Sequence, residues 1–140
     1  MPFGEYYYNL DDKGRVVIPP PFRDFVAGGM VLSRGQEGFI YVFPKYRWEE
    51  IEAKLRGAPL LDYERQSLIR WLYMPAHFTK MDRSGRILIP PQLRKYAGLK
   101  DEVVVLGGPD RLEIWDSERW QRWIRQPPPI SREQLREIGI

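Results

Sequence analysis

The apolar positions in the first part of the chain alternate in a way that predicts strands. Residues 3–10 are rich in aromatic side chains, with Tyr6, Tyr8 and Leu10 at period two, and residues 15–18 are β-branched apart from Arg15. This period of two is typical of a half-buried strand. Residues 19–21 are prolines, which end the second strand because proline has no N–H to donate to a ladder. We therefore predict a strand, a turn and a strand, then a short helical turn that begins at Pro21.

Two more apolar runs, at 30–33 and 39–43, predict a pair of strands joined by a loop with two glycines. The second half of the chain repeats this order of elements. Its expected strands and helical turn lie at 78–81, 86–89, 92–99, 103–106 and 112–115. Because strands dominate both halves, we predict an α+β fold that is mainly β.

A helical pattern separates the two halves. Residues 45–73 carry apolar side chains at intervals of three and four, interrupted by a Gly-Ala-Pro sequence. We predict a hairpin of two short helices there and a counterpart after the second half, which begins near Trp120. That counterpart ends at prolines 127–129, a stiff spacer. The segment beyond it predicts one or two amphipathic turns, capped by Ser131 and Gln134.

One charged motif occurs twice. Residues 10–23 read LDDKGRVVIPPPFR and residues 81–94 read MDRSGRILIPPQLR, at a constant offset of 71 positions. The matching pairs include Asp11 with Asp82, Gly14 with Gly85, Arg15 with Arg86, Pro19 with Pro90, and Arg23 with Arg94. A duplicated turn with charges at fixed spacing indicates two copies of one binding element and not a single catalytic pocket.

Each copy of the motif predicts a tight turn that opens with an aspartate and closes with an arginine. The glycine in the turn can adopt positive φ, and the Asp-x-x-x-Arg spacing brings the two charges close together. For Asp11 and Asp82 two interpretations stay open. One is a structural salt bridge or turn cap, since an aspartate at the first position of a turn usually bonds its own backbone. The other is direct contact with a ligand.

The arginines point to a ligand more directly. Arg15 and Arg86, beside Lys13 and Arg83, form a paired cationic edge at two predicted hairpin tips. The planar fork of arginine suits bidentate contact with phosphate or with guanine in the major groove. A two-stranded β-ribbon is narrow enough to enter that groove. The second copy carries the larger local excess of basic residues, so we predict unequal contributions from the two copies.

The length, net charge and residue composition of the chain exclude several kinds of binding site. The 140 residues fit two small copies that share one core, because a copy of about 45 residues is near the lower limit for an independent core. The net charge of +3 excludes a general electrostatic coat on nucleic acid but allows a local basic patch. The chain has no cysteine, which excludes disulfides and thiolate metal sites. His77 is the only histidine, so we predict no zinc site and no cofactor.

Three function classes remain, in decreasing order of support. A DNA-binding regulator explains the duplicated charged turn. An interaction scaffold or adaptor would use the aromatic helical stretches and the amphipathic tail. An enzyme has almost no support, because the sequence offers no nucleophile–base pair, metal-ligand set or cofactor loop. The start of the chain has no signal-peptide pattern, and no apolar stretch reaches the roughly 18 residues of a membrane span, so we predict a soluble, cytoplasmic protein.

Several segments carry a resemblance to a known family. Gly4-Glu5, the two charged motifs, YAGL at 96–99 and LEIW at 112–115 occur in the order typical of the MraZ family of bacterial transcription regulators. The resemblance spans roughly residues 3–123. It implies two SpoVT–AbrB-type repeats that form a swapped-hairpin β-barrel within one chain. It also implies that the chains assemble into closed homo-oligomeric rings. We expect neither a membrane nor a small-molecule substrate as a partner.

The same resemblance implies a ligand and a set of site residues. The ligand would be double-stranded DNA that carries short direct repeats. These repeats lie upstream of the division and cell-wall gene cluster, which includes the family member's own gene. A protein bound there would be nucleoid-associated. The DNA-contacting residues would be Arg15 and Arg86, with Lys13 and Arg83 in the same loops. Asp11, Asp82, Gly14 and Gly85 would shape the loops. The expected divisions are repeat 1 at 3–47, a helical connector at 48–74, repeat 2 at 75–118, and a C-terminal helix with a proline-spaced tail at 119–140.

Overall fold

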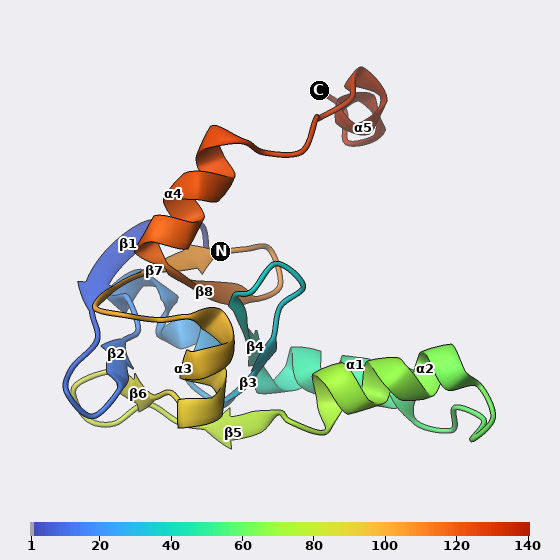
Figure 1. Cartoon of the computed structure of the whole chain (residues 1–140), viewed down its shortest axis with the longest axis horizontal. Helices are drawn as coiled ribbons and strands as arrows, with labels where there is room; N and C mark the ends of the chain where they lie inside the picture. The colour runs from blue at the N-terminus through green and yellow to red at the C-terminus, as the bar shows by residue number, and fades with distance from the viewer. Residues whose placement is uncertain (1) are drawn as a thin grey trace.

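The strands of the protein follow the apolar runs of its sequence closely. The computed structural model describes residues 2–140. Its strands are β1 (Gly4–Asn9), β2 (Arg15–Val17), β3 (Met30–Arg34), β4 (Ile40–Pro44), β5 (His77–Thr79), β6 (Arg86–Leu88), β7 (Glu102–Gly107) and β8 (Leu112–Asp116). The fold is mixed α and β and mainly sheet, as the sequence predicts (Figure 1).

The helices lie mostly between and after these strands. They are α1 (Lys45–Leu55), α2 (Tyr63–Leu68), α3 (Pro91–Ala97), α4 (Ser117–Arg125) and α5 (Arg132–Glu137), with 3-10 turns η1 (Pro20–Phe22) and η2 (Asp24–Val26) and the π-helical turn η3 (Ile69–Tyr73). Ser131 and Gln134 form the predicted capping box of α5. Within residues 2–140, none of these helices combines the length and the apolar composition that a membrane crossing requires.

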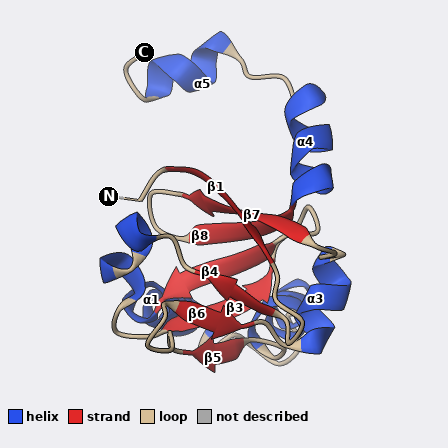
Figure 2. Ribbon diagram, turned by 90° about the vertical axis from the view of Figure 1, so that its left-hand side faces the viewer, coloured by secondary structure: helices blue, strands red, loops and turns tan. Residues whose placement is uncertain are grey.

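Two antiparallel sheets mix strands from the two copies of the motif. The larger sheet has the order β1-β7-β8-β4-β3-β5, and the smaller one pairs β2 with β6. Strand β1 precedes the first charged turn but pairs with β7 of the second half. Strand β5 precedes the second charged turn but pairs with β3 of the first half. The two halves therefore complete each other's sheets (Figure 2).

The strands that flank each charged turn do not form the hairpin that the sequence predicts. Strand β1 pairs with β7, whereas β2 pairs with β6 across the two copies, with Val16 opposite Ile87. Both of these side chains are buried, and so are Ile18 and Ile89 immediately after the strands. Pairing β2 with its equivalent therefore places four β-branched side chains together over the larger sheet, which a hairpin within one copy would not achieve.

A single core lies between the β2–β6 ribbon and one face of the larger sheet. Helix α3 and the 3-10 turns contribute Leu93, Ala97, Phe22 and Val26 to it. The strands of the larger sheet contribute alternate residues, as period two requires: Met30, Leu32, Ile40, Val42, Val103, Val105, Leu112 and Ile114. The other face of this sheet carries aromatic side chains that pack under α1 and α4.

One helical prediction needs correction, and the two copies differ at a second helical segment. The first half is followed by two helices, α1 and α2, but the second half is followed by α4 alone, since α5 lies beyond the proline spacer and is exposed throughout. The segment after Pro19 forms two 3-10 turns, whereas its equivalent after Pro90 forms the α-helix α3. The first copy has Pro21 where the second has Gln92, and a proline disfavours the α conformation of the residue before it, here Pro20.

Candidate nucleic-acid interface

The first charged loop is held by the carboxylate of Asp11. One oxygen, Oδ1, accepts hydrogen bonds from the backbone N–H groups of Lys13 at 2.9 Å and Arg15 at 2.8 Å. The other oxygen, Oδ2, accepts from Nε of Arg15 at 2.6 Å. Gly14 completes the turn with a φ of +82°, which L side chains rarely adopt. Asp11 thus fixes both the loop backbone and the direction of the Arg15 side chain.

The second loop repeats this geometry. Asp82 Oδ1 accepts from the N–H groups of Ser84 at 2.8 Å and Arg86 at 2.9 Å, and Oδ2 accepts from Arg86 Nε at 3.1 Å. Gly85 has a φ of +76°. The ion pairs expected from the Asp-x-x-x-Arg spacing therefore form in both copies.

The β2–β6 ribbon brings the two loops to one edge of the molecule. Arg15 lies opposite Leu88, and Arg86 lies opposite Val17. At each end of the ribbon, a backbone N–H of one copy donates a hydrogen bond to the carbonyl oxygen of the turn glycine in the other copy. The N–H of Ile18 donates to Gly85 at 2.8 Å, and the N–H of Ile89 donates to Gly14 at 3.0 Å. The distance from Arg86 Nη1 to Asp11 Oδ2 is 3.8 Å, so charges of the two copies are also in direct contact.

The arginines of the motif's last position are exchanged between the loops. A Cβ atom at Gly14 would lie 2.4 Å from the guanidinium of Arg94, and one at Gly85 would lie 2.4 Å from that of Arg23. Each loop is therefore covered by the arginine of the other copy. The sequence groups Arg23 with the more acidic first copy, but in space it joins the more basic second loop. The matching positions of Arg23 and Arg94 in the two copies could have indicated a shared role, but the sequence does not show which loop each arginine covers.

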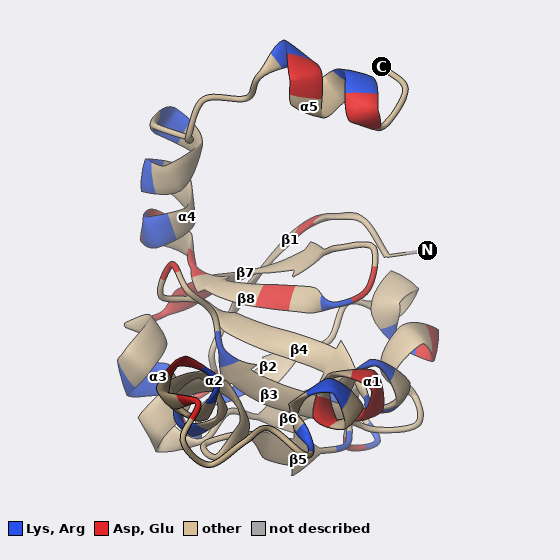
Figure 3. Ribbon diagram, turned by 90° about the vertical axis from the view of Figure 1, so that its right-hand side faces the viewer, with Lys and Arg blue, Asp and Glu red and all other residues tan. Residues whose placement is uncertain are grey.

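The cations of this edge, which we call the paired-loop surface (Lys13, Arg15, Arg83 and Arg86), are accessible. Lys13 and Arg83 are exposed, and the side chains of Arg15 and Arg86 are 29% and 34% exposed. Within residues 2–140, the Nη groups of Arg15 donate no hydrogen bond to the chain, so they are available to an external acceptor. Charged residues of both signs are distributed over the other elements, and α3 and α4 carry further basic residues (Figure 3).

Backbone N–H groups set the titration of the two loop aspartates. The hydrogen bond from the N–H of Arg15 is the largest cause that lowers the pKa of Asp11, to about 2. The corresponding bond from Arg86 lowers the pKa of Asp82 below its usual value. Because the folded pKa is lowered, the charged form stabilises the loop above about pH 4, and this contribution disappears as the pH falls through the folded pKa.

We predict that an NMR titration of the Asp11 carboxyl carbon has its midpoint near pH 2. The variant Arg15→Ala should keep most of this depression, because the backbone N–H of residue 15 remains and is the leading cause. A midpoint near 3.8 in the unmodified protein would show that the loop hydrogen bonds are absent in solution. A return to that value in the variant alone would assign the effect to the guanidinium instead.

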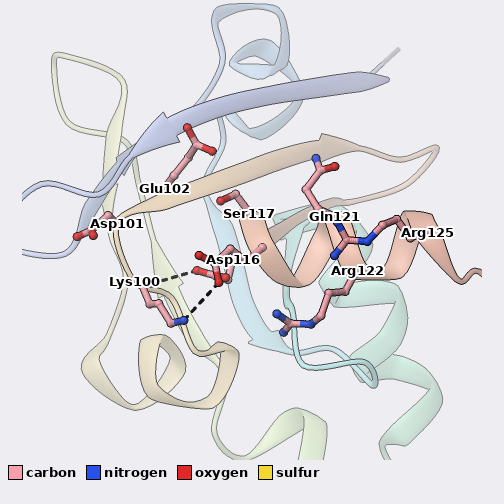
Figure 4. A pocket seen from close by; sticks show the side chains of 9 residues that line it. Lys100, Asp101, Glu102, Asp116, Ser117, Gln121, Arg122 and Arg125 are labelled. Carbon is pink, nitrogen blue, oxygen red and sulfur yellow. Dashed lines mark hydrogen bonds and ion pairs between the residues drawn. The ribbon is translucent and has the colours of Figure 1, made fainter.

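A large hollow of the surface lies elsewhere, between α4 and the segment that leads into β7 (Figure 4). It has a volume of about 700 Å³, and its lining mixes acidic and basic side chains. Lys100 Nζ lies 3.5 Å from Glu118, and the N–H of Lys100 donates to Asp116. Since these charges already pair within the chain, the hollow presents no field of one sign.

The structure also places the other side chains that were considered as sites. His77 lies in β5 opposite Leu32, and its side chain is exposed. Across residues 2–140, no three side chains of the kinds that bind metals gather in one place. Trp48 and Trp115 are buried, and the other tryptophans are half-buried in packing against the sheet or its helices. The paired-loop surface is thus the part of the molecule where duplicated sequence and duplicated geometry coincide.

Comparisons with known proteins agree with the resemblance carried by the motifs. Residues 1–70 and 72–137 match the family described as "MraZ protein, putative antitoxin-like". The chain is 59% identical to the transcriptional regulator MraZ of Thermus thermophilus over 128 residues, which cover 90% of this chain and 89% of that protein. It is 48% identical to the protein of the same name from Deinococcus radiodurans, over 86% of this chain and 85% of the relative. The chain belongs to the MraZ family.

Proposed function

We propose that the protein is a sequence-specific DNA-binding transcriptional regulator, and that the paired-loop surface is its DNA-binding edge. The observation that carries this proposal is the pairing of β2 with β6, which joins two charged loops into one ribbon. The name of the relatives, transcriptional regulator, is consistent with this role. We expect no enzymatic activity.

The geometry suits contact with a duplex. Arg15 and Arg86 are diagonal neighbours across the ribbon, which corresponds to about 7–8 Å between their Cα atoms. The major groove is about 12 Å wide and admits a two-stranded ribbon. Each aspartate orients its arginine through Nε. Both Nη groups of Arg15 are left for phosphate or base edges, and so is Nη2 of Arg86, whose Nη1 also lies 3.8 Å from Asp11. Lys13 and Arg83 would add phosphate contacts, which position a protein on the duplex without reading its sequence.

A single subunit would bind weakly. Affinity for duplex DNA rises with the number of phosphates neutralised, and each ribbon offers only four cations, two of which are paired with aspartate. Several ribbons acting together would gain affinity through multivalency. We therefore propose that the chain assembles into a closed homo-oligomeric ring. Its operator would consist of tandem direct repeats upstream of the division and cell-wall gene cluster, including its own gene.

The strand exchange supports a more specific description of the fold. We propose that the two halves form the swapped-hairpin β-barrel of SpoVT–AbrB-type repeats, with repeat 1 at 3–47 and repeat 2 at 75–118. The intervening segment 48–74 would then be the connector, and 119–140 the C-terminal helix and tail. A cytoplasmic, nucleoid-associated location follows from the proposed ligand.

Fluorescence anisotropy with a duplex from immediately upstream of the gene tests the function. We predict tighter binding to this duplex than to a shuffled control, and loss of the difference when the repeats are scrambled. Affinity should fall as salt rises, because bound cations release counterions from the DNA. Equal and steeply salt-dependent affinity for both duplexes would leave only a non-specific binder. Absence of binding to either would favour the interaction-scaffold hypothesis.

A further inference from the structure

The C-terminal segment is a folded element without a partner in its own chain. Helix α5 has its capping box formed, which satisfies two N–H groups at its start. Yet every residue from 126 to 140 is exposed. The apolar side chains of this segment are Ile130, Leu135, Ile138 and Ile140, at 72%, 38%, 73% and 80% exposure. Leu135 lies in α5 and Ile138 is its C-cap residue three positions later, so the two side chains lie on one side of the segment.

The connection to the domain keeps α5 away from the rest of its own chain. Prolines 127–129 favour an extended, semi-rigid conformation of about 3.1 Å per residue. In all three views, α5 lies at the far end of α4, at the opposite end of the molecule from α1 and α2 (Figures 1, 2 and 3). A stiff spacer that points outward favours contact with another molecule over folding back.

A groove that lacks a cover lies at that opposite end. It runs between α1 and the segment from η3 to β5 and has a volume of about 630 Å³. Trp48 and Tyr73 stack in it with ring centroids 5.5 Å apart. Met74 and Phe78 also line it, at 65% and 49% exposure. Such a set of exposed apolar side chains around a hollow is the usual form of a helix-binding groove.

The charges beside the groove complement those of α5. Glu49, Glu52 and Lys45 line it from α1, so its charge is acidic by one unit. Glu52 already forms an ion pair with Arg56 at 3.1 Å and accepts a hydrogen bond from the Tyr73 hydroxyl, which leaves Glu49 as the acidic group for an incoming cation. On α5, Arg132 and Arg136 are four residues apart and flank the apolar face on one side. Glu49 makes no ion pair within residues 2–140. An α5 with Leu135 and Ile138 in the groove can therefore direct its arginines toward the acidic side.

We propose that α5 of one subunit docks in the groove between α1 and β5 of a second copy of this chain. Leu135 and Ile138 cover Met74, Phe78 and the Trp48–Tyr73 pair, while Arg132 and Arg136 face Glu49 and Glu52. The contact joins different surfaces of the two copies, so it is a heterologous interface, which closes into a ring or continues as a chain. The contact does not involve the paired-loop surface, so it can be tested independently of DNA binding.

Site-directed cross-linking tests the docking, since the natural chain has no cysteine. Full-length Ile138→Cys and full-length Met74→Cys are mixed and treated with a short bismaleimide. We expect a covalent dimer at least 10-fold more abundant than in a mixture of Ile138→Cys with Asn9→Cys. Asn9 is also an exposed site and lies on β1, the sheet edge opposite β5. Equal yields in the two mixtures would overturn the proposal.

Two further variants separate the docking from its alternatives. The first variant combines Leu135→Asp with Arg132→Glu in the Ile138→Cys chain, so that the cysteine at position 138 is kept. They should reduce the cross-link at least 10-fold, whereas Glu133→Gln with Glu137→Gln on the opposite face should leave it unchanged. Both pairs should leave the far-UV circular dichroism of the domain unchanged, because residues 126–140 are exposed and α5 packs against nothing within residues 2–140. If a chain carrying both cysteines gives only an internally linked monomer, the groove belongs to its own tail and the second-copy proposal is wrong.

Discussion

Replacing Arg15 and Arg86 together with alanine is expected to weaken binding to the upstream duplex by roughly 30-fold to more than 1,000-fold. Each well-placed arginine contributes about 1–3 kcal/mol to base recognition, and about 1.4 kcal/mol corresponds to a factor of ten in affinity. The fold should persist, because both side chains are partly exposed and their loops keep the backbone hydrogen bonds to Asp11 and Asp82. Anisotropy at fixed salt measures the loss, and circular dichroism checks the fold.

The matched control removes the same charge elsewhere. Arg56 is the C-cap residue of α1 and Arg65 lies in α2, between β4 and β5, and both are exposed. The double variant Arg56→Ala, Arg65→Ala changes the net charge by the same amount but leaves the paired-loop surface intact. We expect less than about a threefold change in affinity, since distant exposed charges are largely screened. Equal losses in both double variants would mean that net charge, and not the ribbon, determines binding.

The variant Ile87→Ala is expected to lower the free energy of unfolding by about 2–5 kcal/mol, a large part of the 5–15 kcal/mol typical of a domain. Ile87 is 1% exposed and lies opposite Val16 in the ribbon, above the core of the larger sheet. Truncating it leaves a cavity where the two copies meet. Urea denaturation followed by circular dichroism measures the change, and the slope of the transition checks that unfolding stays cooperative.

The neighbouring position provides the control for this second experiment. Leu88 is in the same strand but is 49% exposed on the opposite face of the ribbon. We expect Leu88→Ala to cost less than about 1 kcal/mol, because much of its side chain stays in water in the folded state. Similar losses for the two variants would contradict the burial of Ile87 and with it the pairing of β2 with β6.

Local chemistry made much of the site predictable from the sequence. The Asp-x-x-x-Arg spacing, with glycine before the arginine, specifies a turn in which the carboxylate caps the backbone and pairs with the guanidinium. Both loops adopt this geometry: the distance from Nε of Arg15 to Oδ2 of Asp11 is 2.6 Å, and that from Nε of Arg86 to Oδ2 of Asp82 is 3.1 Å. Such contacts lie within five residues of chain, so they depend little on the rest of the fold.

The partners of the strands were not predictable in the same way. Because the motif is duplicated, β2 has the same pattern of apolar and polar residues as β6, and a local hairpin and an exchange between copies satisfy that pattern equally well. Burial of Val16, Ile18, Ile87 and Ile89 over one sheet favours the exchange. The same exchange moves Arg23 to the loop of Gly85 and Arg94 to that of Gly14.

The strands, the two charged turns and the four cations beside them could be predicted from the amino-acid sequence, because side-chain periodicity and turn chemistry act over a few residues. Three features became known only from the folded chain: the two turns share one ribbon, each turn is covered by an arginine of the other copy, and α5 has no partner within residues 2–140. These features depend on which apolar surfaces are buried together. That choice is made by the whole core and not by any segment alone.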